Sequence, residues 1–220
     1  MDTTQPIPKT GNEMFFARHE DFLKRAKSGP IGLLFLGDSI TAAWADSPHI
    51  WEHYYGAYQP ANFGIGGDQT QHVIWRISQG ELDGITPKVV VLLIGTNNCG
   101  SYSAAEISAG VQKIISLIHE KIPATKVLAL GTFPRGPRIN ADGNPDNWES
   151  HMEKIRTVNA DLARLDNGDN IRHLDITSSF LHQDGTIPEI IMPDQVHLTS
   201  AGYQLWADAM HPLLQELLAS

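Results

Sequence analysis

An aspartate and a histidine three residues apart, Asp194 and His197, lie in the stretch MPDQVHLTSAGY (residues 192–203) near the end of the chain. Pro193 stiffens the loop that holds them, and a helical pattern follows. A carboxylate at this spacing can reach Nδ1 of the imidazole, fix its tautomer and stabilise the imidazolium. The other ring nitrogen would then be free to take a proton from a nucleophile. The alternative is a solvated loop of polar residues without a catalytic role.

A candidate nucleophile, Ser39, lies far upstream in LGDSIT (residues 36–41), directly after an apolar run. A serine hydroxyl is a weak nucleophile near pH 7 and needs a base of near-neutral pKa within hydrogen-bond reach. Ser39 is also expected at the N-terminus of the following helix, where free amide groups and the helix dipole favour an oxyanion. The alternative, which position alone favours, is that Ser39 only caps that helix.

Two other segments that follow apolar runs carry groups able to stabilise negative charge. FGIGGDQT (residues 63–70) supplies glycines whose backbone N–H groups can face a ligand, and Gly67 is the best placed of them. IGTNN (residues 94–98) supplies the side-chain amide of Asn97, a neutral donor. Both also have ordinary interpretations, as a tight turn and as a turn asparagine. The glycines do not form a dinucleotide-binding loop, because Gln69 stands where G-x-G-x-x-G needs its last glycine.

The elements that must position these groups alternate between strand-length apolar runs and helix-length amphipathic stretches. We expect strands over residues 31–36, 61–66, 88–94, 126–132 and 171–177. Two of these runs, 88–94 and 126–132, are apolar at nearly every position, as is typical of parallel strands covered on both faces. Strand–helix alternation predicts one doubly wound α/β domain, a three-layer α/β/α sandwich, over residues 1–220. Such folds place their sites at the carboxyl ends of the strands.

Two helices have clear signals in the sequence. Ser103 and Glu106 form a capping-box pair, which predicts a helix beginning there. A last helix is expected after Thr199, and Pro212 within it is expected to kink or split it. Residues 1–14 precede the first pattern and form an N-terminal arm whose order the sequence leaves open.

Composition excludes several classes of function. Sixteen basic and 25 acidic residues give a net charge of −9, so the chain is a poor candidate for binding nucleic acid. No apolar run approaches the roughly 20 residues that span a membrane, so no integral membrane association is expected. The N-terminus lacks the apolar core of a signal peptide. We therefore expect a cytoplasmic protein, although a signal that had been removed would leave no trace.

The cysteine and histidine content argues against metal sites. The single cysteine, Cys99, excludes an internal disulfide and a thiolate-rich zinc site, and we expect it to be a buried structural thiol. The ten histidines show neither HExxH nor a comparable paired spacing, so no metal is expected.

The four blocks LGDSIT, FGIGGD, IGTNN and DQVHLT occur in this order, each after a predicted strand or before the last helix. In these motifs the chain resembles the SGNH (GDSL-type) esterases and lipases over nearly its whole length. Within that family, NFGIGGDQTQHVIWRISQGEL and KVVVLLIGTNN look very like the catalytic subunits of intracellular platelet-activating factor acetylhydrolases, whereas DQVHLTSAGY agrees less closely. Ile40 replaces the leucine of GDSL, a change that touches the pocket beside the nucleophile.

The resemblance implies a role for each candidate residue. By position, Ser39 is the nucleophile, His197 the base and Asp194 the acid that orients it. The oxyanion hole would consist of the Ser39 and Gly67 backbone N–H groups and the Asn97 side chain. The resemblance also implies a flavodoxin-like sheet of five parallel strands, no cofactor and a homodimer.

The residues beside the candidate catalytic groups bear on the acyl half of the substrate. Ile40, Thr96 and Val196 flank the candidate catalytic residues and are branched, so they are expected to form stiff walls on the acyl side. This predicts a small ester substrate with an acetyl or other short acyl group. The alternative is that these three side chains only pack against the sheet.

The alcohol half of the substrate is left open between a carbohydrate and a phospholipid-like headgroup. The segment HVIWR (residues 72–76) could line the mouth of the site, although Val73 and Trp75 more simply bury a helix. The longest polar loop, residues 134–150, is either a substrate-recognition loop or a surface excursion.

Three other functions compete with a short-chain esterase. A thioesterase or a lysophospholipase would use the same triad. A non-catalytic binding protein could keep the fold, although such proteins commonly lack the serine or the histidine. A flavin- or nucleotide-binding protein would need a phosphate loop after the first strand, which GDSIT supplies only weakly.

Overall fold

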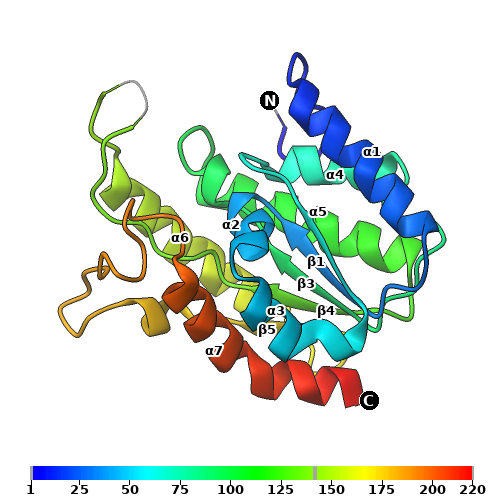
Figure 1. The fold of residues 1–220 in the computed structure, drawn as a ribbon. Helices are drawn as coiled ribbons and strands as arrows, with labels where there is room; N and C mark the ends of the chain where they lie inside the picture. Colours follow the sequence, from blue (N-terminus) through cyan, green and yellow to red (C-terminus); the bar gives the residue numbers. More distant parts are fainter. Residues whose placement is uncertain (1, 141–142, 220) are drawn as a thin grey trace.

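A five-stranded sheet between two layers of helices forms the centre of the protein, as the computed structural model, which describes residues 2–140 and 143–219, shows (Figure 1). The strands are β1 (Leu33–Gly37), β2 (Pro60–Gly64), β3 (Val89–Leu93), β4 (Lys126–Leu130) and β5 (Ile171–Leu174). All neighbouring strands are parallel, in the order β2-β1-β3-β4-β5. The predicted α/β/α sandwich with a flavodoxin-like sheet is confirmed, and each strand overlaps its predicted run.

Helices cover both faces of the sheet (Figure 1). One face carries α1 (Glu13–Lys27), α4 (Thr70–Ser78), α5 (Ala104–Lys121) and α6 (Trp148–Ala163). The other carries α3 (Pro48–Tyr55) and α7 (Ser200–Ala219), and the short α2 (Ser39–Ala42) follows β1. Single 3₁₀ turns occupy Ala43–Asp46, Gly56–Tyr58, Thr96–Asn98 and Thr177–Phe180. Among the described helices, none is long and apolar enough to cross a membrane.

The strands are apolar throughout because both of their faces are buried. Successive side chains of a strand point to opposite faces. Leu34 and Leu36 therefore join the core under α1, α4, α5 and α6, whereas Leu33 and Phe35 join the core under α3 and α7. All five positions of β1 and of β3 are buried, so these strands form the centre of the sheet on which the site is built.

Local signals in the sequence largely determine where the helices begin. The capping box of Ser103 and Glu106 is confirmed, and α5 begins directly after it. The last helix also begins as predicted, and it runs through Pro212 as one element. Of the two outcomes expected for Pro212, a kink or a split, the split is therefore excluded. Tertiary packing of the apolar face of α7 holds the helix together across the proline.

The N-terminal arm packs against the helices of the first face. Thr3 is buried and its Oγ1 donates to the carbonyl oxygen of Glu106 at 2.6 Å. The backbone N–H of Ile7 donates to the carbonyl oxygen of Gln71 at 3.1 Å. The arm is thereby fixed at the start of α4 and α5, near the carboxyl ends of the strands.

The strand order reverses at β1. Its neighbours are β2 on one side and β3 on the other, so the connections from β1 to β2 and from β2 to β3 lead to opposite sides of β1. In open parallel sheets a ligand crevice forms at the carboxyl end of such a switch point. Ser39 follows β1 at that point.

Candidate active site

Ser39 is the first residue of α2, but it does not cap this helix. The cap is Asp38, whose side chain accepts a hydrogen bond from the backbone N–H of Ile40 at 2.9 Å. The Ser39 hydroxyl is therefore free to turn outward, and its Oγ lies 2.9 Å from Nε2 of His197. The capping interpretation of Ser39 is wrong because the preceding aspartate already fills that role.

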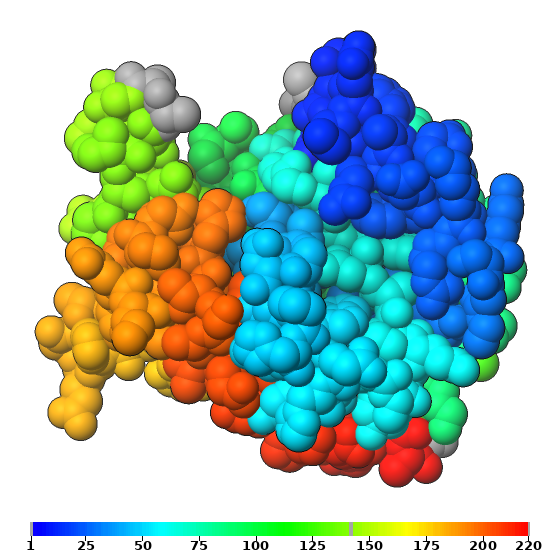
Figure 2. Space-filling model, in the orientation of Figure 1, coloured from blue at the N-terminus to red at the C-terminus, as the bar shows by residue number. Residues whose placement is uncertain are grey.

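The histidine and its acid come from the loop before α7, which Figure 2 shows in orange against the light-blue segment around α2. His197 Nδ1 lies 2.7 Å from Asp194 Oδ2. The other carboxylate oxygen accepts hydrogen bonds from the backbone N–H groups of His197 at 2.7 Å and Val196 at 3.0 Å. The structure thus brings Ser39, His197 and Asp194 into one chain of contacts although they are far apart in the sequence.

The charge on Asp194 is set by these same contacts. Partial burial opposes its ionisation, but the hydrogen bonds from the His197 backbone and ring outweigh burial and hold the pKa of Asp194 below its usual value. The carboxylate is therefore ionised at neutral pH. About two fifths of each side chain is exposed, 44% for His197 and 41% for Asp194.

The acid–base loop is supported by the segment that follows β4. Gln195 has a left-handed backbone, with φ +64°, and its carbonyl oxygen accepts from the N–H of Gly136 at 3.0 Å. A side chain at position 136 would collide with that of Gln195. Arg138 Nη1 lies 3.6 Å from Asp194 Oδ2. The part of residues 134–150 that the structure describes is thus in contact with the loop that carries Asp194, while residues 141 and 142 lie outside the described residues.

The glycines after β2 form a turn beside the nucleophile. The Asp68 N–H donates to the Ile65 carbonyl oxygen at 3.1 Å, and Gly67 has φ +71°, so Gly66 and Gly67 are the central residues of a type II turn. A Cβ atom placed on Gly66 would lie 3.9 Å from Ser39 Cβ. The turn therefore brings bare backbone close to Ser39.

Asn97 lies in the 3₁₀ turn after β3 and contacts the same turn. Its Nδ2 donates to the carbonyl oxygen of Asp68 at 2.9 Å and lies 3.4 Å from Asp38 Oδ2. The second contact is long for a hydrogen bond. One N–H of the amide thus binds the turn through Asp68, and the other makes only a weak contact with Asp38.

A buried charge cluster lies beneath the turn. Asp68 and Arg76 have no exposed side-chain surface, and Arg76 Nε lies 2.9 Å from Asp68 Oδ2. Arg76 also pairs with Glu81, and it donates to the carbonyl oxygens of Phe63 at 3.1 Å and Gly37 at 3.3 Å. The guanidinium thus ties the ends of β1 and β2 to the turn.

This cluster bears on the segment HVIWR, for which the sequence left open whether it lines the mouth of the site or buries a helix. Arg76 is buried beneath the turn, together with Val73 and Ile77 of the same helix. The sequence did contain a signal for this burial. Asp68 lies just before the start of a helix and Arg76 lies on the apolar face of that helix, a pattern that indicates a buried ion pair. Sequence reasoning did not identify Asp68 or Arg76 as site residues.

Asp38 is buried beside this cluster. Burial, together with the nearby charge of Asp68, raises the pKa of Asp38 to about 7. The group that caps α2 is therefore partly protonated at neutral pH.

The three residues expected on the acyl side are all buried, with exposed fractions of 2% for Ile40 and 4% for Thr96 and Val196. Ile40 also belongs to the core under α3 and α7. Thr96 Oγ1 accepts from Arg135 Nη1 at 3.1 Å. Their role as walls of an acyl pocket stays a prediction. Cys99, predicted as a buried structural thiol, is free and buried, and burial raises its pKa to about 11.

One pocket lies beside the turn. It has a volume of ≈ 560 Å³ and is lined by Ile7, Pro8, Thr10, Gln69, Gln71, His72, Ser101 and Tyr102. Gln69 connects it to the candidate site, because its Nε2 donates to the carbonyl oxygen of Asn97 at 2.7 Å. Burial lowers the pKa of His72 to about 4, so this side chain is neutral at pH 7.

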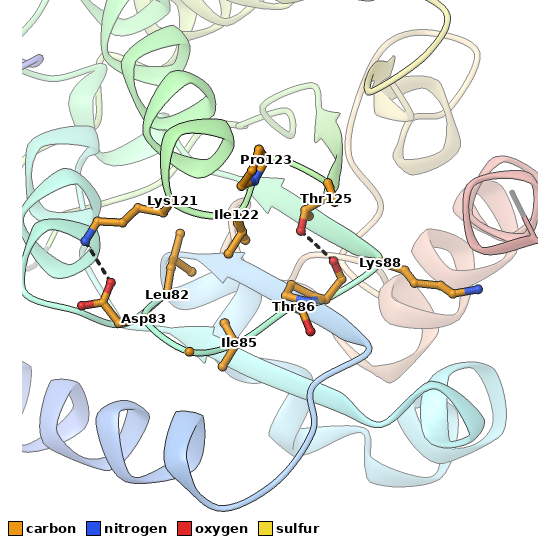
Figure 3. Close-up of a pocket in the computed structure, with 12 residues that line it drawn as sticks. Leu82, Asp83, Ile85, Thr86, Lys88, Lys121, Ile122, Pro123 and Thr125 are labelled. Atoms are coloured by element: carbon orange, nitrogen blue, oxygen red, sulfur yellow. Dashed lines mark hydrogen bonds and ion pairs between the residues drawn. The ribbon is translucent and has the colours of Figure 1, made fainter.

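A second pocket, of ≈ 540 Å³, lies at the opposite end of the sheet (Figure 3). It is lined by the segments that precede β3 and β4, among them Leu82, Ile85, Ile122 and Pro123. It is therefore at the amino ends of the strands, away from Ser39. Within residues 2–140 and 143–219, no group of three or more His, Cys, Asp or Glu side chains is arranged to hold a metal ion.

The model of the GDSL-like lipase/acylhydrolase family matches residues 35–205, a span that contains Ser39, Asn97, Asp194 and His197. The chain belongs to this family. The hydrolase is 36% identical over 208 residues to platelet-activating factor acetylhydrolase IB subunit alpha2 of Gallus gallus, covering 94% of the chain and 86% of the relative. It is 37% identical over 210 residues to the IB subunit alpha1 of Homo sapiens, covering 95% and 86%. These relatives and the family identify the hydrolase as a carboxylic ester hydrolase, as the sequence motifs predicted.

Solved structures with low sequence identity share the fold of the hydrolase. A GDSL-like lipase from Bacteroides thetaiotaomicron superposes with a TM-score of 0.72 at 16% identity, over 91% of this chain and 98% of that one. A carbohydrate acetylesterase from Sinorhizobium meliloti superposes with a TM-score of 0.64 at 16% identity, over 84% and 98%. At this level of identity the likeness shows the α/β/α fold.

Proposed function

We propose that the hydrolase is a serine esterase that cleaves short-chain, acetyl-type esters through an acyl-serine intermediate. The observation that carries the proposal is the chain of contacts from Ser39 Oγ to His197 Nε2, 2.9 Å, and from His197 Nδ1 to Asp194 Oδ2, 2.7 Å. It lies at the carboxyl end of β1, where the fold places ligand sites.

The proposed mechanism has two steps. His197 takes the Ser39 proton as Oγ attacks the ester carbonyl, and the tetrahedral intermediate collapses by releasing the alcohol, which receives that proton. Water, deprotonated by His197, then attacks the acyl carbonyl, the bond to Ser39 Oγ breaks and the acid is released, while Oγ takes the proton back from His197. Asp194 holds the tautomer with the proton on Nδ1 and stabilises the imidazolium in both steps.

The oxyanion is proposed to be held by three donors, the N–H of Ser39, the N–H of Gly67 and the side-chain amide of Asn97. Asn97 can serve because its contact with Asp38 Oδ2, at 3.4 Å, is weak and easily exchanged for an oxyanion. Its other N–H, bound to Asp68 O at 2.9 Å, keeps the amide in place. Donors fixed before the reaction stabilise the developing charge without reorganising.

The acyl half is proposed to be acetyl or another short chain. Ile40, Thr96 and Val196 are buried and branched next to the catalytic residues, so they leave little room for a long chain and cannot rotate aside easily. The names of the acetylhydrolase relatives agree with this preference. A thioesterase or lysophospholipase with the same triad is the alternative.

The alcohol half is proposed to be neutral and polyhydroxylated, as in a carbohydrate, rather than a phosphorylated headgroup. The pocket beside the turn supports this choice, because none of the described residues that line it is charged at neutral pH. Beside the apolar Ile7 and Pro8, the pocket carries hydroxyl and amide groups suited to sugar hydroxyls, among them those of Thr10, Gln71 and Tyr102. A phosphate would need cations there.

The test is hydrolysis of p-nitrophenyl acetate, butyrate, octanoate and laurate by the wild type, Ser39→Ala and Asn97→Ala. Ser39→Ala is expected to lose at least about 10⁴-fold in kcat, and Asn97→Ala about 10²–10³-fold, so that only the asparagine variant keeps clear activity. Activity that falls with chain length supports the short-acyl proposal. Laurate cleaved faster than acetate would overturn it, and activity that survives Ser39→Ala would overturn the mechanism.

A further inference from the structure

The side chain of Lys9 reaches the turn beside Ser39 from the N-terminal arm. Its Nζ donates to the carbonyl oxygen of Gly66 at 2.6 Å and lies 2.7 Å from Asp68 Oδ1. One ammonium thus binds the residues on both sides of Gly67. Only 12% of the lysine side chain is exposed, so these contacts are largely shielded from water. Lys9 precedes residues 35–205, which match the family model, so family membership does not assign it a role.

The carbonyl of Gly66 and the N–H of Gly67 belong to the same peptide unit. A trans peptide is planar, so its C=O and N–H point in opposite directions. This unit is the central peptide of the type II turn, and rotating it by half a turn converts type II into type I. Between two glycines that rotation meets little steric resistance, because neither residue has a Cβ. Something outside the turn must therefore fix the direction of the Gly67 N–H.

We propose that Lys9 is a positioning residue that orients and polarises the Gly67 N–H for the oxyanion. Binding of the ammonium to Gly66 O holds the peptide in one orientation and draws electron density from its nitrogen, which strengthens the N–H as a donor. The inference rests on the proposed function, in which Gly67 is an oxyanion donor. Asp68 keeps Nζ in place, and Asp68 is itself held by Arg76.

The proposal predicts a specific kinetic signature. A donor that matters only when the oxyanion forms affects kcat and leaves substrate binding nearly unchanged. In Lys9→Met, kcat for p-nitrophenyl acetate is expected to fall about 10- to 100-fold, less than the 10²–10³-fold of a donor that is removed outright, with KM within about twofold. Lys9→Arg keeps the charge and the donors, so its kcat is expected to remain within about fivefold of the wild type.

A matched variant distinguishes the positioning of the Gly67 N–H by Lys9 from a general effect of the N-terminal arm packing against the helices. Thr3→Val removes the hydrogen bond from Thr3 Oγ1 to Glu106 O, which is on the same arm but away from the turn. Its kcat is expected to stay within about twofold of the wild type, because no donor near Ser39 changes. An equal loss in Thr3→Val and Lys9→Met would overturn the proposal, since both would then act by loosening the arm.

A transition-state mimic provides a second readout. An aryl trifluoromethyl ketone adds to a catalytic serine as a hemiketal whose oxygen occupies the oxyanion hole. Its inhibition constant is expected to rise in Lys9→Met by about the same factor as kcat falls. Thermal unfolding checks that each variant is folded, and Lys9→Ala replaces Lys9→Met if the methionine packs badly. Ser39-dependent activity that is unchanged in a folded Lys9 variant overturns only this inference, whereas activity that survives Ser39→Ala overturns the proposed function itself.

Discussion

The two loops that face Ser39 are held in opposite ways. The turn after β2 lies over buried ion pairs, in which Asp68 and Arg76 have no exposed side-chain surface. The loop before α7 is open to water, with His197 and Asp194 exposed by 44% and 41%. Its catalytic carboxylate is held by hydrogen bonds within a few residues, and the Gly136 N–H donates to its Gln195 carbonyl oxygen from the segment after β4. Under the proposed mechanism the first loop supplies fixed dipoles and the second exchanges protons with water and alcohol. The difference in burial matches the difference in task.

The comparison also indicates where mutations should be costly. A buried charge is tolerated only while its partners are present, so the turn couples the stability of the fold to the geometry of the site. Charges on the exposed loop are solvated and screened, so each pair contributes little by itself. Three substitutions test this difference.

The largest effect is expected for Arg76→Met. The change leaves Asp68 and Glu81 without their shared cation in a site that water does not reach, so the free energy of unfolding should fall by about 3–5 kcal/mol. Urea denaturation measures the loss. Arg164→Met is the matched control, because the Arg164–Asp161 pair has a similar distance, 2.7 Å, but the arginine side chain is 76% exposed. The control should lose less than about 1 kcal/mol, and similar losses in both variants would contradict the comparison.

An intermediate, pH-dependent effect is expected for Asp38→Asn. Burial raises the pKa of Asp38 to about 7, so the folded protein keeps a proton that the unfolded chain releases near pH 4. The folded state therefore binds more protons between these two values. The stabilisation from this group is complete below about pH 4 and is lost as the pH rises through about 7.

Asparagine imitates the protonated acid and can still accept from the Ile40 N–H, as Asp38 does. The wild type should therefore lose stability relative to Asp38→Asn as the pH rises from about 4 to 7. The measurement is the difference between the unfolding free energies of the two proteins across this range. A difference that stays constant with pH would show that Asp38 does not titrate in that window.

The exposed loop, and the strands, were the more predictable parts of the molecule. The continuous apolar runs predicted the sheet, and the spacing of Asp194 and His197 predicted a contact that the loop makes within one turn. Both signals are local, so the sequence carries them directly.

The buried side depends on contacts between distant segments. Lys9 and Gly66 are 57 positions apart, and the arm that carries Lys9 has no periodic pattern, so nothing in the sequence indicated their contact. Arginine is seldom buried, and the burial of Arg76 is tolerable only because Asp68 and Glu81 lie around it, which the sequence did not indicate. For Ser39, position alone favoured a capping role, because position cannot tell which of two neighbouring polar residues caps a helix.

The smallest effect is expected for Arg138→Gln. Arg138 Nη1 lies 3.6 Å from Asp194 Oδ2, next to the proposed catalytic acid, and its side chain is 24% exposed. Because solvent and salt screen this pair, kcat/KM for p-nitrophenyl acetate should change by less than about threefold at 0.15 M salt, and somewhat more at 0.01 M. The hydrogen bonds from His197 and Val196 remain and keep the carboxylate in place. A loss in kcat/KM above about tenfold at 0.15 M salt would mean that the exposed loop depends on a charge from another segment, as the buried turn does. The two loops that face Ser39 would then not differ in the way their burial indicates.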